Sequence, residues 1–344
     1  MKELSKIPIE NIYYMLCYAW NKLDYLDRNK VGILEENDVL NLLCRIFVNE
    51  VNFITKKGIN REYNSFDEEV STIKGKININ KSIELMLSKK NKLNCGYEEL
   101  DFNITINKIL KTTIINLLKT KNLSEYNKKY LKNILFYFSS IDTIYLNERL
   151  FNSIKYNTSN KSYKFIINIC KLINDNLLIA ENGEEAEFYN FLEDERKMAY
   201  LFENFIRNFY KKELKSSKVY RENIKWNLKG ENLEYIPKME TDISIEFSNK
   251  KIIMDTKYYK NALNNNFGKD KLISGNLYQL FAYLKNNENK SFKDKNSEGI
   301  LIYPRVNIDL DLRYTMENHI IKICTVNLNM KWNNIKDRLL TIIL

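Results

Sequence analysis

The sequence predicts an α/β protein of two parts: a mostly helical N-terminal part with a projecting β-hairpin, and a C-terminal part with a mixed sheet flanked by helices. Apolar residues recur at helical spacing along most of the first half. Two short segments near residues 243 and 252 instead have the composition and period of strands. Beyond them helical and strand patterns alternate, which is typical of a sheet covered by helices. A chain of 344 residues is long enough for two separate cores.

Most of the N-terminal half is predicted to be helical. Its apolar residues recur every three or four positions, which predicts packing of one helix face into a core. The expected helices cover about residues 10–23, 37–51, 104–119, 125–138 and 163–174.

One stretch of this half, between residues 61 and 83, has a different pattern. It consists of short β-like pieces around Lys74-Gly75-Lys76. Gly75 permits a bulge or a tight bend at that point. We interpret the stretch as a projecting β-hairpin whose basic flanks can contact a partner, and a simple surface loop is the alternative.

A polar segment over residues 180–187 is the best candidate for a domain boundary. It contains Asn182-Gly183 and four glutamates. We therefore expect one domain over residues 1–183 and a second over residues 184–344.

The second half is predicted to alternate helices and strands around one sheet. Expected helices cover about residues 187–212, 271–285 and the end of the chain from about 333, and expected strands cover about 218–228, 299–303 and 320–326. A hairpin of two strands, 243–247 and 252–254, lies between them.

This hairpin carries the candidate catalytic residues. If its turn centres on Asn249-Lys250, Asp242 falls opposite Lys257, and Asp255 lies one step away on the same face. Carboxylates are hard oxygen ligands suited to Mg²⁺, which lowers the pKa of water and stabilises charge on a phosphodiester. The ammonium can position that water or neutralise the transition state. The alternative is a surface hairpin with ordinary charges, but Asp255 ends an apolar run, where an idle charge is costly to bury.

Three further residues are candidates for the same site. Glu203 lies one position away from the apolar stripe of the helix over 187–212 and could supply another carboxylate, although a helical glutamate usually faces water. Gln279 and Tyr283 lie on one face of the next helix and could orient the lysine, a water or a phosphate. The alternative for this pair is a polar helix edge beside the core.

Composition restricts the class of protein. Lysine and arginine exceed aspartate and glutamate by 54 to 44, which favours a polyanionic partner, although the Lys, Asn and Ile bias also fits a low-GC coding habit. Five dispersed cysteines predict a reducing compartment, and a single histidine, His319, argues against a zinc site or a Ser-His-Asp triad. With no signal-peptide pattern and no apolar run of about 18 residues, the chain is expected to be soluble and cytoplasmic, with no membrane partner.

Taken together, these residues resemble a known family of nucleases. The pattern TD-x(12)-DTK, with an upstream helical glutamate and a downstream QxxxY, is similar to the PD-(D/E)XK nuclease superfamily. The form from Pro237 through DTKYY at 255–259 resembles the McrC family in particular, the nuclease subunits of McrBC modification-dependent restriction systems. Similar segments are IPIENIYYMLCYAW at 7–20, KGKI at 74–77 and CGYEELDFN…NKILK at 95–111. The proline precedes Asp242 by five residues, as is common in this family but not in the superfamily's nominal PD dipeptide.

The resemblance implies roles for the candidate residues. Asp242 and Asp255 would ligate Mg²⁺ together with the carbonyl of Thr256. Lys257 would assist the attack of water. Glu203, Gln279 and Tyr283 match accessory positions.

The resemblance also implies partners. One is an McrB-like hexameric AAA+ GTPase that the N-terminal half contacts and stimulates, and the other is methylated double-stranded DNA. This sequence contains no P-loop pattern GxxxxGK[ST], so GTP would be bound by the partner. The predicted function is a Mg²⁺-dependent endonuclease subunit of a GTP-driven restriction complex. The alternatives are a non-catalytic adaptor that docks the GTPase to DNA, and an exonuclease acting on DNA ends.

Overall fold

A computed structural model describes residues 7–23, 36, 38–180, 184–259, 263–266, 269–305 and 308–344. The chain divides into two compact units. The helical unit is Asp38–Tyr189, and the sheet unit combines Met1–Asn37 with Asn190–Leu344. The expected boundary at residue 183 falls in 181–183, outside the described residues.

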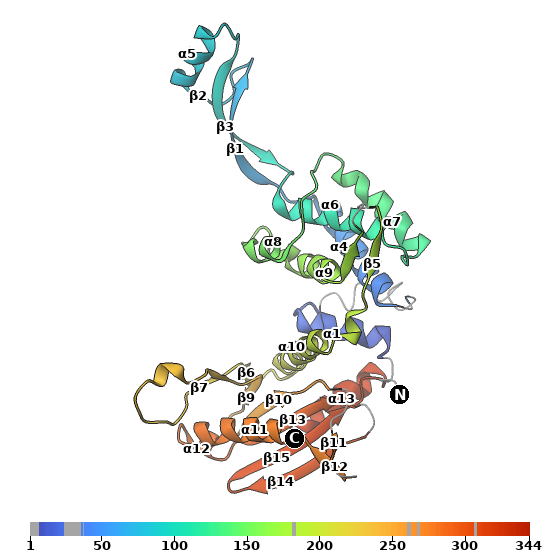
Figure 1. Cartoon of the computed structure of the whole chain (residues 1–344), viewed down its shortest axis with the longest axis vertical. Coiled ribbons are helices and arrows are strands. Elements are labelled where there is room, and N and C mark those ends of the chain that lie inside the picture. The colour runs from blue at the N-terminus through green and yellow to red at the C-terminus, as the bar shows by residue number, and fades with distance from the viewer. Residues whose placement is uncertain are drawn as a thin grey trace. The chain divides into compact units, whose positions relative to one another are not determined.

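The helical unit contains the expected bundle together with a β arm (Figure 1). Its helices are α4 (Val39–Lys57), α5 (Ile79–Leu87), α6 (Thr105–Leu118), α7 (Glu125–Leu135), α8 (Glu148–Ser153) and α9 (Lys164–Asn174). Its strands are β1 (Glu62–Val70), β2 (Lys76–Ile77), β3 (Leu93–Asp101), β4 (Leu177–Ile179) and β5 (Ala186–Phe188). Helix α4 begins where the side chain of Asp38 accepts a hydrogen bond from the Asn41 amide, and it ends at Gly58 with φ +93°. It packs against α7 and α9 through a mostly apolar face.

A projecting β arm is confirmed, but β1 and β2 do not pair with each other as a hairpin, because β3 lies between them. β1 pairs antiparallel with β3 from Glu62↔Asp101 to Val70↔Leu93, and the pair extends away from helices α4 and α6–α9 of its own unit (Figure 1). Residues 79–87, expected to be partly β, form α5 instead, and β3 was not expected. The second half of β3 is largely exposed and carries the mostly charged run Glu98-Glu99-Leu100-Asp101. β3 therefore lacks the apolar alternation that predicts a strand with one buried face.

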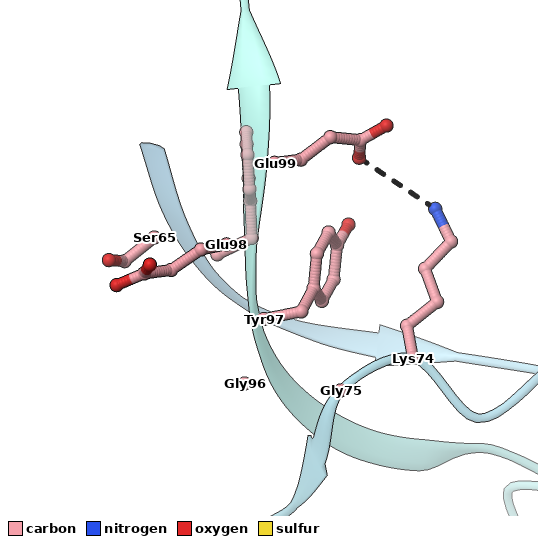
Figure 2. A pocket seen from close by; sticks show the side chains of 8 residues that line it. Ser65, Lys74, Gly75, Gly96, Tyr97, Glu98 and Glu99 are labelled. Carbon is pink, nitrogen blue, oxygen red and sulfur yellow. Dashed lines mark ion pairs between the residues drawn. The ribbon is translucent and has the colours of Figure 1, made fainter. Parts of the chain in front are cut away.

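Gly75 has the role that the sequence predicted. Its φ is +62°, and a Cβ there would lie 2.6 Å from both the Gly96 carbonyl oxygen and the Tyr97 Cβ. Figure 2 shows this close approach beside Tyr97, whose ring stacks on Phe66 at 5.3 Å and faces the Lys74 ammonium at 5.0 Å. The arm is therefore an ordered structure with its own aromatic packing.

The sheet unit contains a six-stranded mixed sheet in its described part, in the order β14-β15-β13-β10-β9-β6. The strands of this unit are β6 (Lys218–Tyr220), β7 (Asn223–Ile224), β8 (Met239–Glu240), β9 (Ile243–Glu246), β10 (Lys251–Thr256), β11 (Leu263–Asn266), β12 (Lys269–Leu272), β13 (Glu298–Pro304), β14 (Asp311–Met316) and β15 (His319–Val326). Its helices are α1 (Ile9–Ala19), α10 (Glu195–Glu213), α11 (Ser274–Asn287), α12 (Phe292–Lys295) and α13 (Trp332–Ile342). β13 is parallel to both of its neighbours, β10 and β15, and the other pairs of this sheet are antiparallel.

Helix α11 covers one face of the sheet by packing on β10 and β13. Ile253, Leu280 and Leu284 belong to one buried cluster there. Gly299 allows close packing, because a Cβ at that position would lie 2.9 Å from Leu284. α10 packs against the opposite face of β10, where Phe202 meets Tyr258. The predicted α/β arrangement of the second half is thus confirmed.

The first helix belongs to the sheet unit, although the sequence analysis placed it in the N-terminal domain. Tyr14 stacks on Trp332 with ring centroids 4.4 Å apart, and the Asn11 amide donates to the Leu328 carbonyl at 2.7 Å. The expected domain followed the order of the sequence. Aromatic packing of α1 against α13, near the other end of the chain, instead places α1 in the sheet unit. That the helical unit binds a partner stays a prediction.

The turn of the hairpin lies one residue earlier than expected, which shifts the strand pairing by two positions. Lys251 pairs with Glu246 and Met254 with Ile243, and the Phe247 amide donates to the Lys250 carbonyl at 2.9 Å. The turn therefore centres on Ser248-Asn249. One step beyond the last pair, Asp242 lies opposite Asp255 and not opposite Lys257.

Two expected elements of this unit are shorter than predicted. The helix over 187–212 begins at Glu195, because the Asp194 side chain caps it by accepting hydrogen bonds from the amides of Arg196 and Lys197. The strand over 218–228 is divided into β6 and β7, with Arg221-Glu222 between them. The five cysteines are buried and free, and none of the described helices is long and apolar enough to span a membrane.

Candidate active site

The candidate site lies at the carboxyl end of β10. Asp255 has no exposed surface, and its Oδ2 lies 2.8 Å from the Lys257 ammonium. Both residues share the strand face that carries Ile253, which is covered by α11. The Lys257 amide donates to the Ile302 carbonyl on β13 at 3.0 Å, which holds the chain in place just after the strand.

Asp242 reaches this end of β10 from the start of β9. Its Oδ2 accepts hydrogen bonds from the Thr256 amide at 2.8 Å and from the Thr256 hydroxyl at 2.9 Å. These bonds fix the first acid beside the second. The structure therefore brings Asp242, Asp255, Thr256 and Lys257 together, as the sequence analysis expected.

The Asp255 carboxylate is the unusual feature of this site. Lys257 is near enough to form an ion pair, but neither Asp255 oxygen accepts a well-directed hydrogen bond from the described part of the chain. A fully buried carboxylate normally has such partners. Asp255, the neighbouring Asp242 and the backbone carbonyl of Thr256 form an oxygen-rich set that fits a hard divalent cation such as Mg²⁺.

The electrostatics of the two acids support the same interpretation. Burial, and next the neighbouring Asp242, raises the pKa of Asp255 to about 7 despite the opposing effect of Lys257. Burial, and next the charge of Glu203, also raises the pKa of Asp242, while the Thr256 hydrogen bonds oppose the shift. The folded protein thus disfavours two ionised carboxylates here, and a bound cation would offset that cost.

Gln279 and Tyr283 join the site through a chain of hydrogen bonds. The Lys257 ammonium donates to Gln279 Oε1 at 2.9 Å, Gln279 Nε2 donates to the Tyr283 hydroxyl at 2.6 Å, and that hydroxyl donates to the Glu240 carbonyl at 2.9 Å. Burial raises the pKa of Tyr283 to about 12, so the phenol remains a neutral donor. This chain fixes the lysine relative to β8, just before Asp242.

Glu203 lies near the acids, but arginines hold its carboxylate. Arg207, one turn along α10, contacts Glu203 Oε1 at 2.6 Å, and Arg221 donates to the same oxygen. Within the described ranges, no group of three or more His, Cys, Asp or Glu side chains is arranged to hold a metal. Neither arginine was expected from the sequence. The i, i+4 spacing from Glu203 could have indicated Arg207, whereas no sequence signal indicates Arg221.

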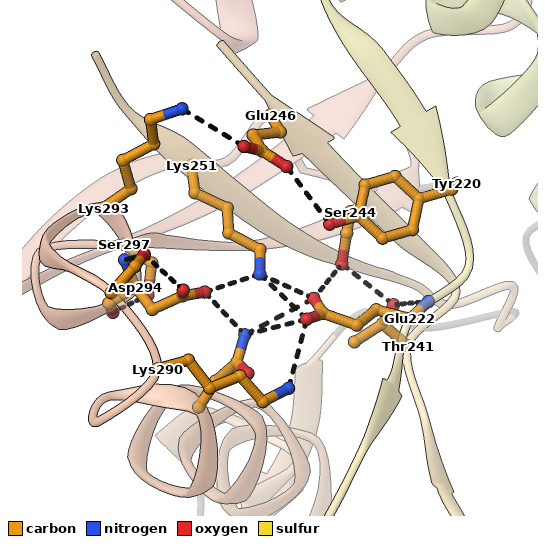
Figure 3. A network of polar contacts seen from close by, with 12 residues as sticks. Tyr220, Glu222, Thr241, Ser244, Glu246, Lys251, Lys290, Lys293, Asp294 and Ser297 are labelled. Atoms are coloured by element: carbon orange, nitrogen blue, oxygen red, sulfur yellow. Dashed lines mark hydrogen bonds and ion pairs between the residues drawn. The ribbon is translucent and has the colours of Figure 1, made fainter. Parts of the chain in front are cut away.

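A buried polar network supports the turn that carries Asp242 (Figure 3). Glu222 and Thr241 exchange two hydrogen bonds, from the Thr241 amide to the Glu222 carbonyl at 2.9 Å and from the Glu222 amide to the Thr241 hydroxyl at 3.0 Å. The Lys251 ammonium lies 2.8 Å from Glu222 Oε2 and 2.5 Å from Asp294 Oδ1. Sequence reasoning missed this network because its members are dispersed over about 70 positions of the chain.

Comparison with known proteins places this arrangement in context. Residues 6–304 match the family model described as McrBC 5-methylcytosine restriction system component. The chain is 32% identical over 346 residues to the type IV methyl-directed restriction enzyme EcoKMcrBC of Escherichia coli (strain K12), covering 99% of this chain and 98% of that protein. Its fold is similar to a chain in the Thermococcus gammatolerans assembly of McrB AAA+ hexamers with bound McrC, with a TM-score of 0.59 at 17% identity, covering 99% of this chain and 78% of the other.

Proposed function

Because this chain belongs to the family of McrBC 5-methylcytosine restriction system components, we propose that it is the Mg²⁺-dependent endonuclease subunit of such a system. The observation that carries the proposal is the fully buried Asp255 carboxylate, which lies beside Asp242 and Lys257 and accepts no directed hydrogen bond from the described residues.

Asp242, Asp255 and the Thr256 carbonyl would hold the cation. Bound Mg²⁺ would lower the pKa of the attacking water and stabilise the charge of the phosphodiester in the transition state. Thr256 fixes Asp242 through two hydrogen bonds, so the ligand is already oriented in the free protein.

Lys257 would act on the water and on the phosphate. Its ammonium, held between Asp255 and Gln279, can orient a water for attack and add positive charge where the transition state becomes more negative. The protein's net charge of +10 favours a DNA backbone as the partner, and binding is expected to weaken steeply with salt.

The reaction is tested with the protein, an McrB-like AAA+ partner, GTP and Mg²⁺ on covalently closed, methylated plasmid. An endonuclease converts the closed circle to nicked and linear forms. An exonuclease would leave the circle intact and degrade linear DNA from its ends, and a non-catalytic adaptor would leave both intact.

Tyr283 is expected to act as a positioning residue for Lys257. Replacing it with phenylalanine removes the hydroxyl that joins Gln279 to Glu240. We expect the rate of cutting to fall about tenfold, with the KM for DNA unchanged, because one hydrogen bond that orients the lysine is lost. The measurement is plasmid cutting at varied DNA concentration.

The matched control for this experiment is Tyr278→Phe on the same helix, since the Tyr278 side chain is 71% exposed. A Tyr283→Phe enzyme that cuts at the Tyr278→Phe rate would contradict the positioning role.

We further propose that the helical unit docks the AAA+ GTPase and stimulates it. The similar Thermococcus chain is described as McrC bound to McrB hexamers. In the present chain, the helix on the arm exposes four apolar residues at positions i, i+4, i+7 and i+8, namely Ile79, Ile83, Met86 and Leu87. These residues are 50–80% exposed, as expected of a face that a partner covers.

A charge on this helix should weaken the complex. We expect Met86→Glu to reduce affinity for the GTPase, and stimulation of GTP hydrolysis at limiting protein, about tenfold, because a carboxylate would be buried against the partner. Asn91→Glu, at an exposed polar position of the same arm, is the control. Equal stimulation by the two variants would rule out this face as the docking surface.

A further inference from the structure

Two arginines lie beside the acid pair and have no part in the reaction described above. Arg207 lies on α10, and Arg221 lies between β6 and β7. Both contact Glu203 Oε1, so one carboxylate oxygen is shared by two guanidinium groups. Arg207 also lies 3.5 Å from the backbone carbonyl oxygen of Asp242, so these arginines are next to a proposed metal ligand.

The two arginines are held differently. The Arg207 side chain is 16% exposed and also donates to the Asn204 side chain. The Arg221 side chain is 39% exposed, and its second ion-pair partner, Glu240, is distant at 3.9 Å. Arg221 can therefore turn toward solvent more easily than Arg207, whose side chain is largely buried.

We propose that Arg221 binds a phosphate of the DNA backbone beside the scissile bond and, in doing so, releases Glu203 toward the metal site. The inference rests on the proposed nuclease function and deepens it. An arginine fork binds a phosphate with two parallel hydrogen bonds, which compete well with a shared carboxylate oxygen. DNA and Mg²⁺ are then coupled ligands, because each one strengthens the binding of the other.

The charges at the site give the physical basis of the coupling. Glu203 already acts on both Asp242 and Asp255, so it lies within electrostatic reach of them. While Arg207 and Arg221 hold it, most of its negative charge is neutralised. Once Arg221 turns to a phosphate, the exposed charge of Glu203 adds to the attraction for a divalent cation. The free protein would thus hold Mg²⁺ weakly until DNA is in place.

The test is calorimetric titration of the full chain with Mg²⁺, with and without a short unmodified duplex that is recovered intact afterwards. For the wild type we expect the duplex to tighten Mg²⁺ binding about tenfold, a typical coupling between two sites. Arg221→Gln should bind Mg²⁺ more tightly without DNA and lose most of the enhancement by DNA. Its DNA affinity should also depend less on salt, by about one phosphate contact.

Two further variants separate release of Glu203 from simple loss of charge. The Lys238 side chain is 69% exposed, and its ammonium lies 3.7 Å from Glu240. Lys238→Gln removes this charge and should leave Mg²⁺ affinity unchanged. In a Glu203→Gln background, Arg221→Gln should have no further effect on Mg²⁺ binding.

An equal effect of Arg221→Gln with and without Glu203 would overturn the inference. An Arg221→Gln protein whose Mg²⁺ affinity is raised by DNA as much as that of the wild type would also overturn it. In either case, plasmid cutting by the wild type would still support the nuclease function. A wild type that binds no Mg²⁺ and cuts no plasmid would instead contradict the proposed function itself.

Discussion

Asp255→Asn is expected to abolish DNA cutting, with a loss of about a thousandfold or more, because the substitution removes one of the two carboxylates that we propose hold the cation. Asparagine matches aspartate in size, so the buried site is preserved. Stimulation of the GTPase should be unchanged, because the substitution leaves the helical unit intact. Both activities are measured together, by plasmid cutting and by phosphate release.

Asp337→Asn is the control for this substitution, since it removes an exposed carboxylate from α13 of the same unit. Lys257→Ala should also abolish cutting and leave GTPase stimulation intact. An Asp255→Asn protein that cuts modified plasmid as fast as the control would show that the site has been placed wrongly.

The same variant has an expected effect on stability. Burial and the nearby Asp242 raise the pKa of Asp255 to about 7 from the ordinary value of 3.8. Without metal, the wild type therefore loses stability as pH rises from about 4 to about 7, because folding must then retain a carboxylate that the site disfavours. Asp255→Asn avoids this loss. Its Tm should exceed that of the wild type by about 5 °C at pH 8 and match it near pH 4.

Lys251→Met is expected to cause the largest loss of stability. The Lys251 side chain is 5% exposed, and its ammonium lies between the carboxylates of Glu222 and Asp294. Removing it leaves two buried acids without their main counter-charge, which costs about 3–5 kcal/mol. The Tm of the sheet unit should fall by about 10 °C at pH 7, measured by calorimetry.

The pH dependence and a combined variant check the cause of this loss. Although burial acts to raise it, the pKa of Glu222 is lowered overall by Lys251 and Lys290. The stability that Glu222 contributes is thus present above its ordinary pKa of 4.5 and is lost as pH falls below it. The difference between wild type and Lys251→Met should therefore shrink near pH 4.

Neutralising both acids together with the lysine, in Lys251→Met/Glu222→Gln/Asp294→Asn, should restore most of the stability, because no buried charge is then left unpaired. A triple variant as unstable as the single one would assign the loss to packing of the lysine stem instead.

Local patterns in the sequence were enough to place the acid pair and the lysine. Asp255 and Lys257 lie two apart on a strand, so the period of the strand alone puts them on one face. Gln279 and Tyr283 follow in the same way from helical spacing. The hairpin register depended on a turn without a strong signal, and the turn lies one residue earlier than predicted. Even so, the acids stay on one face, because that shift of the turn changes their pairing by two positions.

Contacts between distant parts of the chain needed the tertiary structure. The sequence by itself determined the α/β class, the proximity of the carboxylates and lysine of the candidate site, and the glycine that bends the arm. Only the fold joined α1 to α13, placed Lys251 between Glu222 and Asp294, and brought Arg221 to Glu203. The physical reason is that periodicity reports which face of an element is buried, whereas the partner of a buried charge is chosen by how the elements pack.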